Sequence, residues 1–327
     1  MHLSVFSVVD EYPETAAGPD DRLNQVVELA AVADTARPHA FWVAEHHFHD
    51  GGVCPVPAVL LAACGARTRS VRLGVLVSVL PFHPAVEVAE QLAMVDRLTK
   101  GRLQMGFGSG YLPLELEGFG VAPDAKRDLF DRRFDAILAA LRGEPISAGG
   151  APVRINVRPV QRPTPPVWIA VQRPEAIPFV ARRGASLALI PYATVSGLDE
   201  LATQIREYRR HLPDGVVGWV SVGLHLYAGA EPPVARHALQ RYIDSRLAHR
   251  STHLEAKVAR DAGHASAASV ERQGFALFGS AEDVVQRLEA FRAIGVDEVL
   301  GLVDFGGLPA AVAQQTVRAL GERFYPA

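Results

Sequence analysis

Eight short apolar segments, each followed by a segment with helical spacing or a helix start, run through the chain with no break in composition that would mark a domain boundary. Strands that alternate with helices are typical of a parallel sheet, and eight such units favour closure into a barrel. We therefore predict an α/β fold, a (β/α)8 TIM barrel with insertions in the βα loops, in a single domain over residues 1–327. The alternative is an open, doubly wound sheet. The predicted strands cover residues 3–9, 41–44, 71–80, 103–107, 167–170, 187–190, 216–227 and 296–303.

The segments between the strands divide into helices and loops. Helical patterns and helix-start residues predict helices over residues 20–36, 57–66, 87–98, 127–141, 197–212, 232–262, 280–294 and 309–324, and a further helix starts at Pro174. Glycine and proline predict loops over residues 108–126 and 143–166, and small polar residues predict a loop over 263–274. Residues 228–275 form a predicted insertion or lid over the substrate.

The composition restricts the partners and the compartment. A formal charge of −3 gives no electrostatic attraction to nucleic acid or to a membrane surface. Two cysteines, Cys54 and Cys64, are too few for a disulfide scaffold, which favours a reducing compartment. We find no signal peptide and no apolar run long enough for a membrane helix. A cytoplasmic protein that binds neither nucleic acid nor membrane is therefore expected.

The second predicted strand ends in a cluster of titratable side chains, which includes Glu45, His46, His47 and His49. A short apolar strand that carries such groups at its C-terminal end is how α/β barrels position catalytic residues. Alternate residues of a strand share a face, so Glu45 and His47 point away from His46. This divergence, with no later Cys/His cluster, argues against a metal site, and no metal is predicted. A structural role for these histidines in a polar strand end is the alternative to proton transfer.

A glycine-rich stretch, residues 106–111, follows the fourth predicted strand. It resembles a dinucleotide fingerprint only loosely, because Pro113 follows and no helix is expected to open there. The favoured interpretation is a loop whose backbone lies close to a flat or anionic ligand. Ser109 can donate a hydrogen bond, Arg127 can pair with phosphate as a planar fork, and Arg173 adds a cation beside a helix N-terminus. Each arginine alone is more often a surface residue, but together they predict phosphate binding.

Six motifs occur in order along most of the chain: Trp42…Glu45-His46-His47-Phe48, Val71-Arg72-Leu73-Gly74…Leu80-Pro81-Phe82-His83-Pro84, Leu98-Thr99-Lys100-Gly101-Arg102, Gly106-Phe107-Gly108-Ser109-Gly110-Tyr111…Glu115, Arg158-Pro159-Val160-Gln161…Val167-Trp168-Ile169-Ala170 and Asp304-Phe305-Gly306-Gly307-Leu308-Pro309. In their order and spacing they resemble the bacterial luciferase-like flavin monooxygenases. The family fold is a (β/α)8 barrel, which agrees with the prediction above.

The resemblance implies a reduced flavin, usually FMN, that a separate reductase hands over and that reacts with O2. It implies a non-prolyl cis peptide between Leu76 and Val77 under the flavin ring, and a phosphate at Arg127. Ser109 stands where luciferase and many relatives have arginine, and Arg173 where relatives have serine, so the deazaflavin F420 is the alternative cofactor. The implied cofactor-binding residues are Phe6, Leu76, Val77, Ser109, Tyr111, Arg127, Gln172 and Arg173.

The hypothesis is therefore a two-component, FMNH2-dependent monooxygenase. A flavin C4a-(hydro)peroxide would hydroxylate, epoxidise or Baeyer–Villiger oxidise a medium-sized organic substrate, for example one of secondary metabolism. His46 is the candidate catalytic residue, because a histidine suits proton transfer near neutral pH. The alternatives are an F420-dependent oxidoreductase and a non-catalytic flavin-binding relative. The resemblance also implies a homodimer.

Overall fold

The computed structural model describes residues 1–12, 19–49, 51–147, 150–248 and 266–325. Its main sheet contains eight strands in which each pairs in parallel with the next, and the last pairs with the first. The sheet is therefore a closed barrel, and the predicted fold class is confirmed. The strands in barrel order are β1 (His2–Ser7), β2 (Ala40–Val43), β3 (Arg72–Val79), β4 (Leu103–Gly108), β7 (Val167–Val171), β8 (Ser186–Leu189), β9 (Val220–Ala228) and β11 (Glu298–Leu302).

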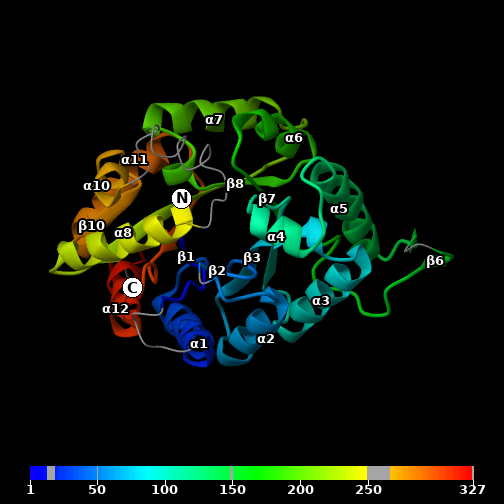
Figure 1. The fold of residues 1–327 in the computed structure, drawn as a ribbon, viewed down its shortest axis with the longest axis horizontal. Coiled ribbons are helices and arrows are strands. Elements are labelled where there is room, and N and C mark those ends of the chain that lie inside the picture. The colour runs from blue at the N-terminus through cyan, green and yellow to red at the C-terminus, as the bar shows by residue number, and fades with distance from the viewer. Residues whose placement is uncertain (13–18, 50, 148–149, 249–265, 326–327) are drawn as a thin grey trace.

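Helices surround the strands in a ring, with α2 and α3 on one side and α6 and α7 on the other (Figure 1). Their apolar faces pack on the outside of the barrel, as the sequence spacing predicts. In the described ranges, no helix combines the length and the apolar character needed to cross a bilayer. The ring helices are α1 (Pro19–Ala36), α2 (Pro57–Arg67), α3 (Ala85–Leu98), α5 (Lys126–Arg142), α6 (Ile177–Arg182), α7 (Leu198–Arg210), α11 (Ala281–Ala293) and α12 (Ala310–Phe324), with short 3-10 turns η2 (Leu80–Phe82), η3 (Pro174–Ala176) and η4 (Pro191–Ala193).

Two predicted loops contain regular structure. The helix α4 (Pro113–Gly118) lies in the loop predicted over 108–126, so the expectation that no helix opens at Pro113 is wrong. Proline suits the first helical position, and buried Leu116 gives this short helix an apolar face. The loop predicted over 143–166 contains the antiparallel pair β5 (Ile146–Ser147) and β6 (Pro152–Val153).

The segment between β9 and α11 also differs from the sequence prediction. The helix α8 (Pro232–Ala248) confirms the first part of the helix predicted over 232–262, whose later part lies outside the described residues. The loop predicted over 263–274 contains the helix α10 (Ala267–Arg272), and the strand β10 (Ala276–Gly279) follows it. The strand β9 begins at residue 220, where its pairing with β8 starts, and not at the predicted residue 216. Short elements of this kind carry too few residues for a clear period.

The strand β10 changes the barrel at the end where the loops gather. The N-terminal half of β9 pairs with β8, over residues 220–222, whereas its C-terminal part pairs with β10, over residues 225–228. The inserted strand therefore takes the place of β8 beside the end of β9. This arrangement brings the insertion, including α8, next to the C-terminal ends of the barrel strands.

A polar layer crosses the barrel interior near its N-terminal end. The fully buried Glu298 of β11 accepts hydrogen bonds from Ser4 Oγ at 2.5 Å, Ser221 Oγ at 2.6 Å and Trp42 Nε1 at 3.2 Å. Trp168 Nε1 donates to Ser221 Oγ at 2.9 Å. Burial raises the pKa of Glu298, and the three donors act in the opposite direction. The layer ties five strands together at fixed register, because each polar group has its partner on a different strand.

Gly74 of β3 lies beneath the Trp42 indole, and a Cβ atom there would lie 2.1 Å from Trp42 Cε3. We expect Gly74→Ala to lower the free energy of unfolding by about 1–3 kcal/mol, because a packed interior resists added volume. Urea unfolding measures the change. Gly150→Ala is the matched control, since a Cβ at Gly150 meets no atom within 4 Å. Equal stability changes in the two variants would contradict the packing described here.

Candidate active site

The short helix α4 brings Glu115 to the histidines that follow β2. Glu115 is buried, and its Oε1 atom lies 2.9 Å from His46 Nδ1, 3.0 Å from the backbone nitrogen of His47 and 3.3 Å from His49 Nε2. Burial alone would raise the pKa of Glu115, but the hydrogen bonds from His46 and His49 lower it to about 2. The carboxylate is therefore ionised at neutral pH and accepts every bond that it makes here.

His46 is held between a carboxylate and a guanidinium. Its Nδ1 faces ionised Glu115 and is therefore assigned the proton, while its Nε2 lies 3.1 Å from Nη1 of Arg246 and accepts from it. Burial, and then the charge of Arg246, lower the pKa of His46 to about 4. The imidazole is thus neutral at pH 7, with a fixed tautomer and one lone pair at Nε2. This arrangement suits proton transfer at Nε2.

Arg246 reaches this cluster from α8, in the inserted segment. Its Nη2 donates to the carbonyl of Gly51 at 2.7 Å, and its Nη1 lies 3.3 Å from the Tyr111 hydroxyl. One side chain therefore links the inserted segment, the end of β2 and the glycine loop after β4. Sequence reasoning missed Arg246, because it is one of several arginines in a polar helix and carries no local motif.

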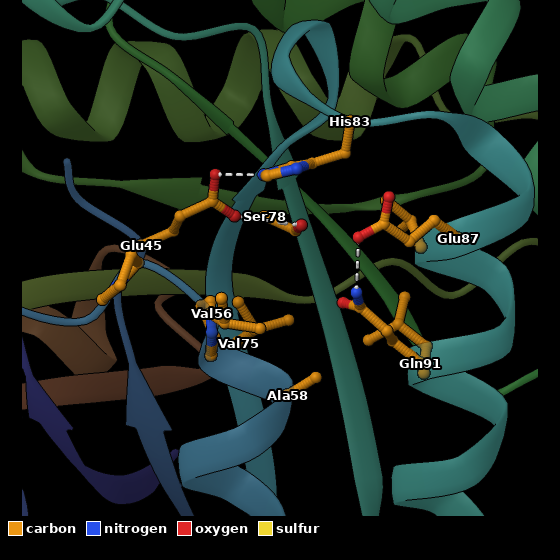
Figure 2. A pocket seen from close by; sticks show the side chains of 12 residues that line it. Glu45, Val56, Ala58, Val75, Ser78, His83, Glu87 and Gln91 are labelled. Carbon is orange, nitrogen blue, oxygen red and sulfur yellow. Dashed lines mark hydrogen bonds and ion pairs between the residues drawn. The ribbon is translucent and has the colours of Figure 1, made fainter. Parts of the chain in front are cut away.

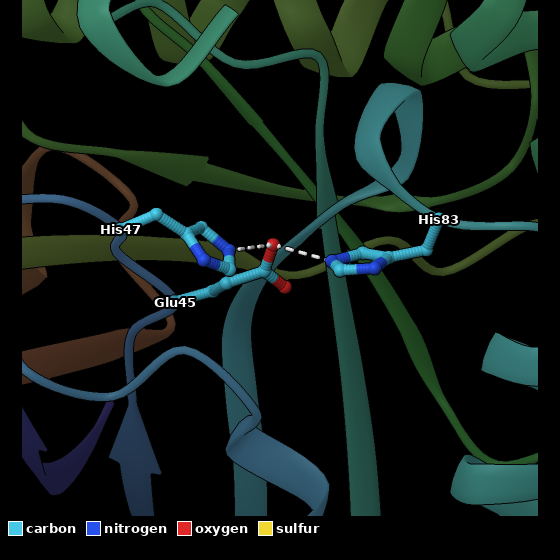
Figure 3. Close-up of side chains that lie close together, drawn as sticks. All are labelled: Glu45, His47 and His83. Atoms are coloured by element: carbon cyan, nitrogen blue, oxygen red, sulfur yellow. Dashed lines mark hydrogen bonds and ion pairs between the residues drawn. The ribbon is translucent and has the colours of Figure 1, made fainter. Parts of the chain in front are cut away.

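A second carboxylate, Glu45, organises the opposite face of the same strand end. Its Oε1 lies 3.1 Å from His47 Nε2 and 2.8 Å from His83 Nε2, and its Oε2 accepts from Ser78 Oγ and the Val79 backbone nitrogen. Figure 3 shows the two imidazoles approaching the carboxylate from opposite sides. Burial opposes ionisation of Glu45, but the bonds from His47 and His83 lower its pKa. The predicted divergence of Glu45 from His46 is confirmed.

Two trios of side chains place possible ligand atoms within 4.8 Å of one another in the described residues: Glu45 with His47 and His83, and His46 with His49 and Glu115. The later members of the trios are one histidine, His83, and one carboxylate, Glu115, which arrive from the following two loops. Each carboxylate, however, is already engaged by three or four hydrogen-bond donors. These contacts account for both trios as hydrogen-bonded clusters.

A small cavity of about 40 Å³ lies beside Glu45 and His83, between α2 and α3 (Figure 2). Glu87 and Gln91 of α3 also line it, and Gln91 donates to Glu87 at 3.0 Å. A cavity of this volume has room for only a few water molecules, since each needs about 10–15 Å³ of such space. The cavity is therefore far too small for a flavin.

The residues expected to line the flavin occupy neighbouring strand ends. Leu76 and Val77 belong to β3 and are joined by a non-prolyl cis peptide, which confirms that expectation. Their neighbours on β4 are glycines: a Cβ at Gly106 would lie 2.5 Å from Leu76, and one at Gly108 would lie 2.6 Å from Val77. The cis peptide can pack this closely against β4 only because both positions lack a side chain.

The polar residues predicted to bind the cofactor lie in the loops that follow β4 and β7, at the rim of the barrel mouth. Ser109 and Tyr111 follow β4 and are half-buried, whereas Gln172 and Arg173 follow β7 and are exposed. Because β7 pairs directly with β4, the two loops start from adjacent strands. Phe6 is buried on β1, where it is the register partner of Trp42.

Arg127 stands in the first turn of α5, with its guanidinium 3.6 Å from the centre of the Phe179 ring. It also pairs with Asp131 at 3.3 Å, and about half of its side chain is exposed.

Of the predicted cofactor-binding residues, Tyr111 lies next to His46. The centres of their rings are 6.4 Å apart, and both side chains contact Arg246. Among the described contacts, Arg127, Gln172 and Arg173 do not touch His46.

The described site can now be compared with known proteins. The family model for luciferase-like monooxygenases matches residues 1–298. The oxygenase component of a flavin-dependent trigonelline monooxygenase from Acinetobacter baylyi is 28% identical over 179 residues, which cover 51% of this chain and 48% of that protein. The chain spans about half the length of the first curated relatives it matches.

Solved structures share the fold over the full chain. Monooxygenase RslO1 from Streptomyces bottropensis has a TM-score of 0.81 at 24% identity, with 100% of this chain and 99% of that chain covered. The oxygenating constituent of 3,6-diketocamphane monooxygenase from Pseudomonas putida, in complex with FMN, has a TM-score of 0.79 at 16% identity, with 100% and 98% covered. At these identities the likeness establishes the fold.

Two buried histidines predict how stability depends on pH. Burial lowers the pKa of His46 to about 4 and that of His225 to about 3, against 6.5 in an unfolded chain. As the pH falls below 6.5, protons bind the unfolded chain first, so the folded state loses stability. We expect each histidine to contribute a loss of about 1.4 kcal/mol per pH unit, which ends near pH 4 for His46 and near pH 3 for His225.

His225→Phe tests this expectation, because both ring nitrogens of His225 lack hydrogen-bond partners and the change removes only the titration. Urea unfolding at about pH 6.5 and about pH 5 should show a slope smaller by about 1.4 kcal/mol per pH unit in the variant. The exposed His237, changed to Phe, is the control. A slope that stays the same in His225→Phe would refute the assignment.

Proposed function

The chain belongs to the luciferase-like monooxygenase family, and on that premise we propose that it is the oxygenase component of a two-component, FMNH2-dependent monooxygenase. It would oxidise a medium-sized organic substrate with O2, using reduced flavin from a separate reductase. The observation that carries the proposal is the neutral His46, held by ionised Glu115 at the C-terminal ends of the barrel strands. A pre-oriented imidazole beside the glycine loop suits proton transfer in a water-poor site.

The residues present fit a flavin. A Cβ at Gly106 or Gly108 would collide with Leu76 or Val77, so the two glycines let β4 pack against the peptide on which the flavin ring would rest. Arg127 and Arg173 supply positive charge at the rim, where a phosphate is best bound. The bound reduced flavin supplies the two electrons with which one atom of O2 enters the substrate and the other leaves as water. The residues that would hold it are Phe6, Leu76, Val77, Ser109, Tyr111, Arg127, Gln172 and Arg173.

Each protein group has a separate role in this proposal. Glu115 holds the proton at His46 Nδ1, which leaves Nε2 to take or return a proton at the reacting atoms. In the structure Arg246 Nη1 donates a hydrogen bond to His46 Nε2. This hydrogen bond must break or weaken during turnover, so that Nε2 can exchange a proton with the reacting atoms. Because Arg246 lies on α8, its contact supports the proposal that residues 228–275 act as a lid that controls access to His46.

A homodimer also belongs to this proposal, and size-exclusion chromatography with light scattering tests it. The alternative cofactor is F420, which Ser109 in place of the luciferase arginine leaves open. Anaerobic equilibrium dialysis with FMNH2 and with reduced F420 separates the two cofactors. Retention of FMNH2 supports the monooxygenase, retention of F420 alone supports the oxidoreductase, and FMN retention without any reaction with O2 supports a non-catalytic relative.

Arg127 should bind the phosphate rather than the flavin ring. We expect Arg127→Gln to weaken FMNH2 binding by about tenfold or more, because a charge-assisted bond to phosphate is lost, and to leave riboflavin binding unchanged. Anaerobic flavin titrations measure both dissociation constants. Arg132→Gln, an exposed arginine on the same helix, is the control. Equal weakening of FMNH2 and riboflavin would show that Arg127 does not hold the phosphate.

His46→Gln keeps a donor for Glu115 but cannot take a proton. We expect reoxidation of bound FMNH2 by O2, which yields FMN and H2O2 in the absence of substrate, to slow by about 10²-fold or more. Stopped-flow absorbance gives the rate, and flavin titration should give an affinity within about twofold of the parent. His49→Gln, which removes the longest of the imidazole contacts to Glu115, serves as the comparison. An unchanged rate in His46→Gln would remove His46 from the proton transfer.

A further inference from the structure

Two arginines, Arg22 and Arg246, are buried in the described part of the chain, and their positive charges have different surroundings. Arg22 is paired with Asp304 at 2.7 Å and with Asp10 at 3.6 Å. Arg246 is also buried, but within residues 1–248 and 266–325, as far as they are described, its contacts are a carbonyl, an imidazole and a hydroxyl, and none is a carboxylate. A buried charge without a counterion is costly, so proteins retain one mainly where a ligand supplies the opposite charge.

The hydrogen bonds of Arg246 leave one edge of the guanidinium available. The group has five N–H donors. Nη1 contacts His46 and Tyr111, Nη2 contacts the Gly51 carbonyl, and Nε has no partner. The remaining donors are therefore Nε–H and one N–H of Nη2. These two atoms form the side edge of the guanidinium fork, which matches the two oxygens of a carboxylate.

Buried aromatic side chains pack beside Arg246. The Tyr242 ring lies 5.0 Å from the Arg246 guanidinium and 5.0 Å from the ring of His225. His225 is fully buried, contacts the rings of Tyr192 and Phe305 at 4.8 Å each, and has no hydrogen-bond partner at either ring nitrogen. The barrel mouth thus combines an uncompensated cation, an unpartnered imidazole and edge-on aromatic rings.

We propose that the Nε/Nη2 edge of Arg246 binds the carboxylate of an aromatic substrate, whose ring lies beside Tyr242 and His225. The proposal rests on the proposed function, since it names the substrate class of that same site. Nη1 lies opposite that edge and touches His46 Nε2, so the guanidinium would stand between the substrate carboxylate and the proton-transfer atom. Binding the carboxylate would also provide the counterion that Arg246 lacks.

Benzoate and its neutral isostere benzamide test the proposal in the flavin-free protein. We expect benzoate at millimolar concentration to raise the thermal unfolding temperature in a saturable way, and benzamide to have no effect. Arg246→Gln should raise the benzoate dissociation constant at least about tenfold. Arg246→Lys, which keeps the charge without the fork, should give an intermediate value. Arg236→Gln is the control on the same helix, because Arg236 is exposed and paired with Glu271.

The opposite results would overturn the proposal. Equal binding of benzoate and benzamide, no binding of benzoate, or unchanged benzoate affinity in both Arg246 variants would each do so. If the Gln variant does not fold, the Lys variant carries the comparison. Loss of anaerobic FMNH2 binding in Arg246→Gln with benzoate binding retained would assign the cation to the reduced flavin ring instead. Because the benzoate assay contains neither flavin nor O2, its failure would leave the monooxygenase proposal to be judged by the FMNH2 experiments.

Discussion

The ionised carboxylate of Glu115 is the contact on which the site depends. It accepts from two imidazoles and one backbone nitrogen of the segment after β2, and this fixes the chain path, the ring orientation and the proton position of His46. The carboxylate comes from a helix of only six residues. Such a helix is marginal by itself, so tertiary contacts must hold it in place. The chemistry proposed for His46 therefore depends on a local element that the rest of the fold stabilises.

One strand end supports two separate networks because side chains alternate along it. Glu45 and His47 point toward β3 and its following turn, where Ser78 and His83 complete a hydrogen-bonded cluster. His46 points to the opposite face, toward the glycine loop and α8. The first network ties two βα loops together, and the second carries the candidate chemistry. Because the two faces are separate, the contacts of Glu45 and His47 leave the side chain of His46 free to interact with Glu115 and Arg246.

Buried ionisable side chains of this barrel differ in how many of their polar atoms have hydrogen-bond or ion-pair partners. Glu298 near the N-terminal end and Arg22 beside Asp304 have partners for their polar atoms. Among the described residues, Arg246 near the C-terminal end contacts no carboxylate, and neither ring nitrogen of the nearby His225 has a hydrogen-bond partner. Arg246 and His225 both lie toward the loop end of the barrel, where α/β barrels place their functional sites.

The sequence by itself determined the barrel, the order of its strands, the divergence of Glu45 from His46 and, through family motifs, the cis peptide at Leu76. These features depend on local patterns: an apolar period, side-chain alternation and residues close together in the chain. Only the tertiary structure decided that Glu115 holds His46, that β10 replaces β8 beside β9, and that Arg246 caps the site from α8. Arg246 lies 200 positions from His46 in the chain. No local pattern encodes such a contact, because it exists only once the closed barrel has brought the ends of its strands and the inserted helix together.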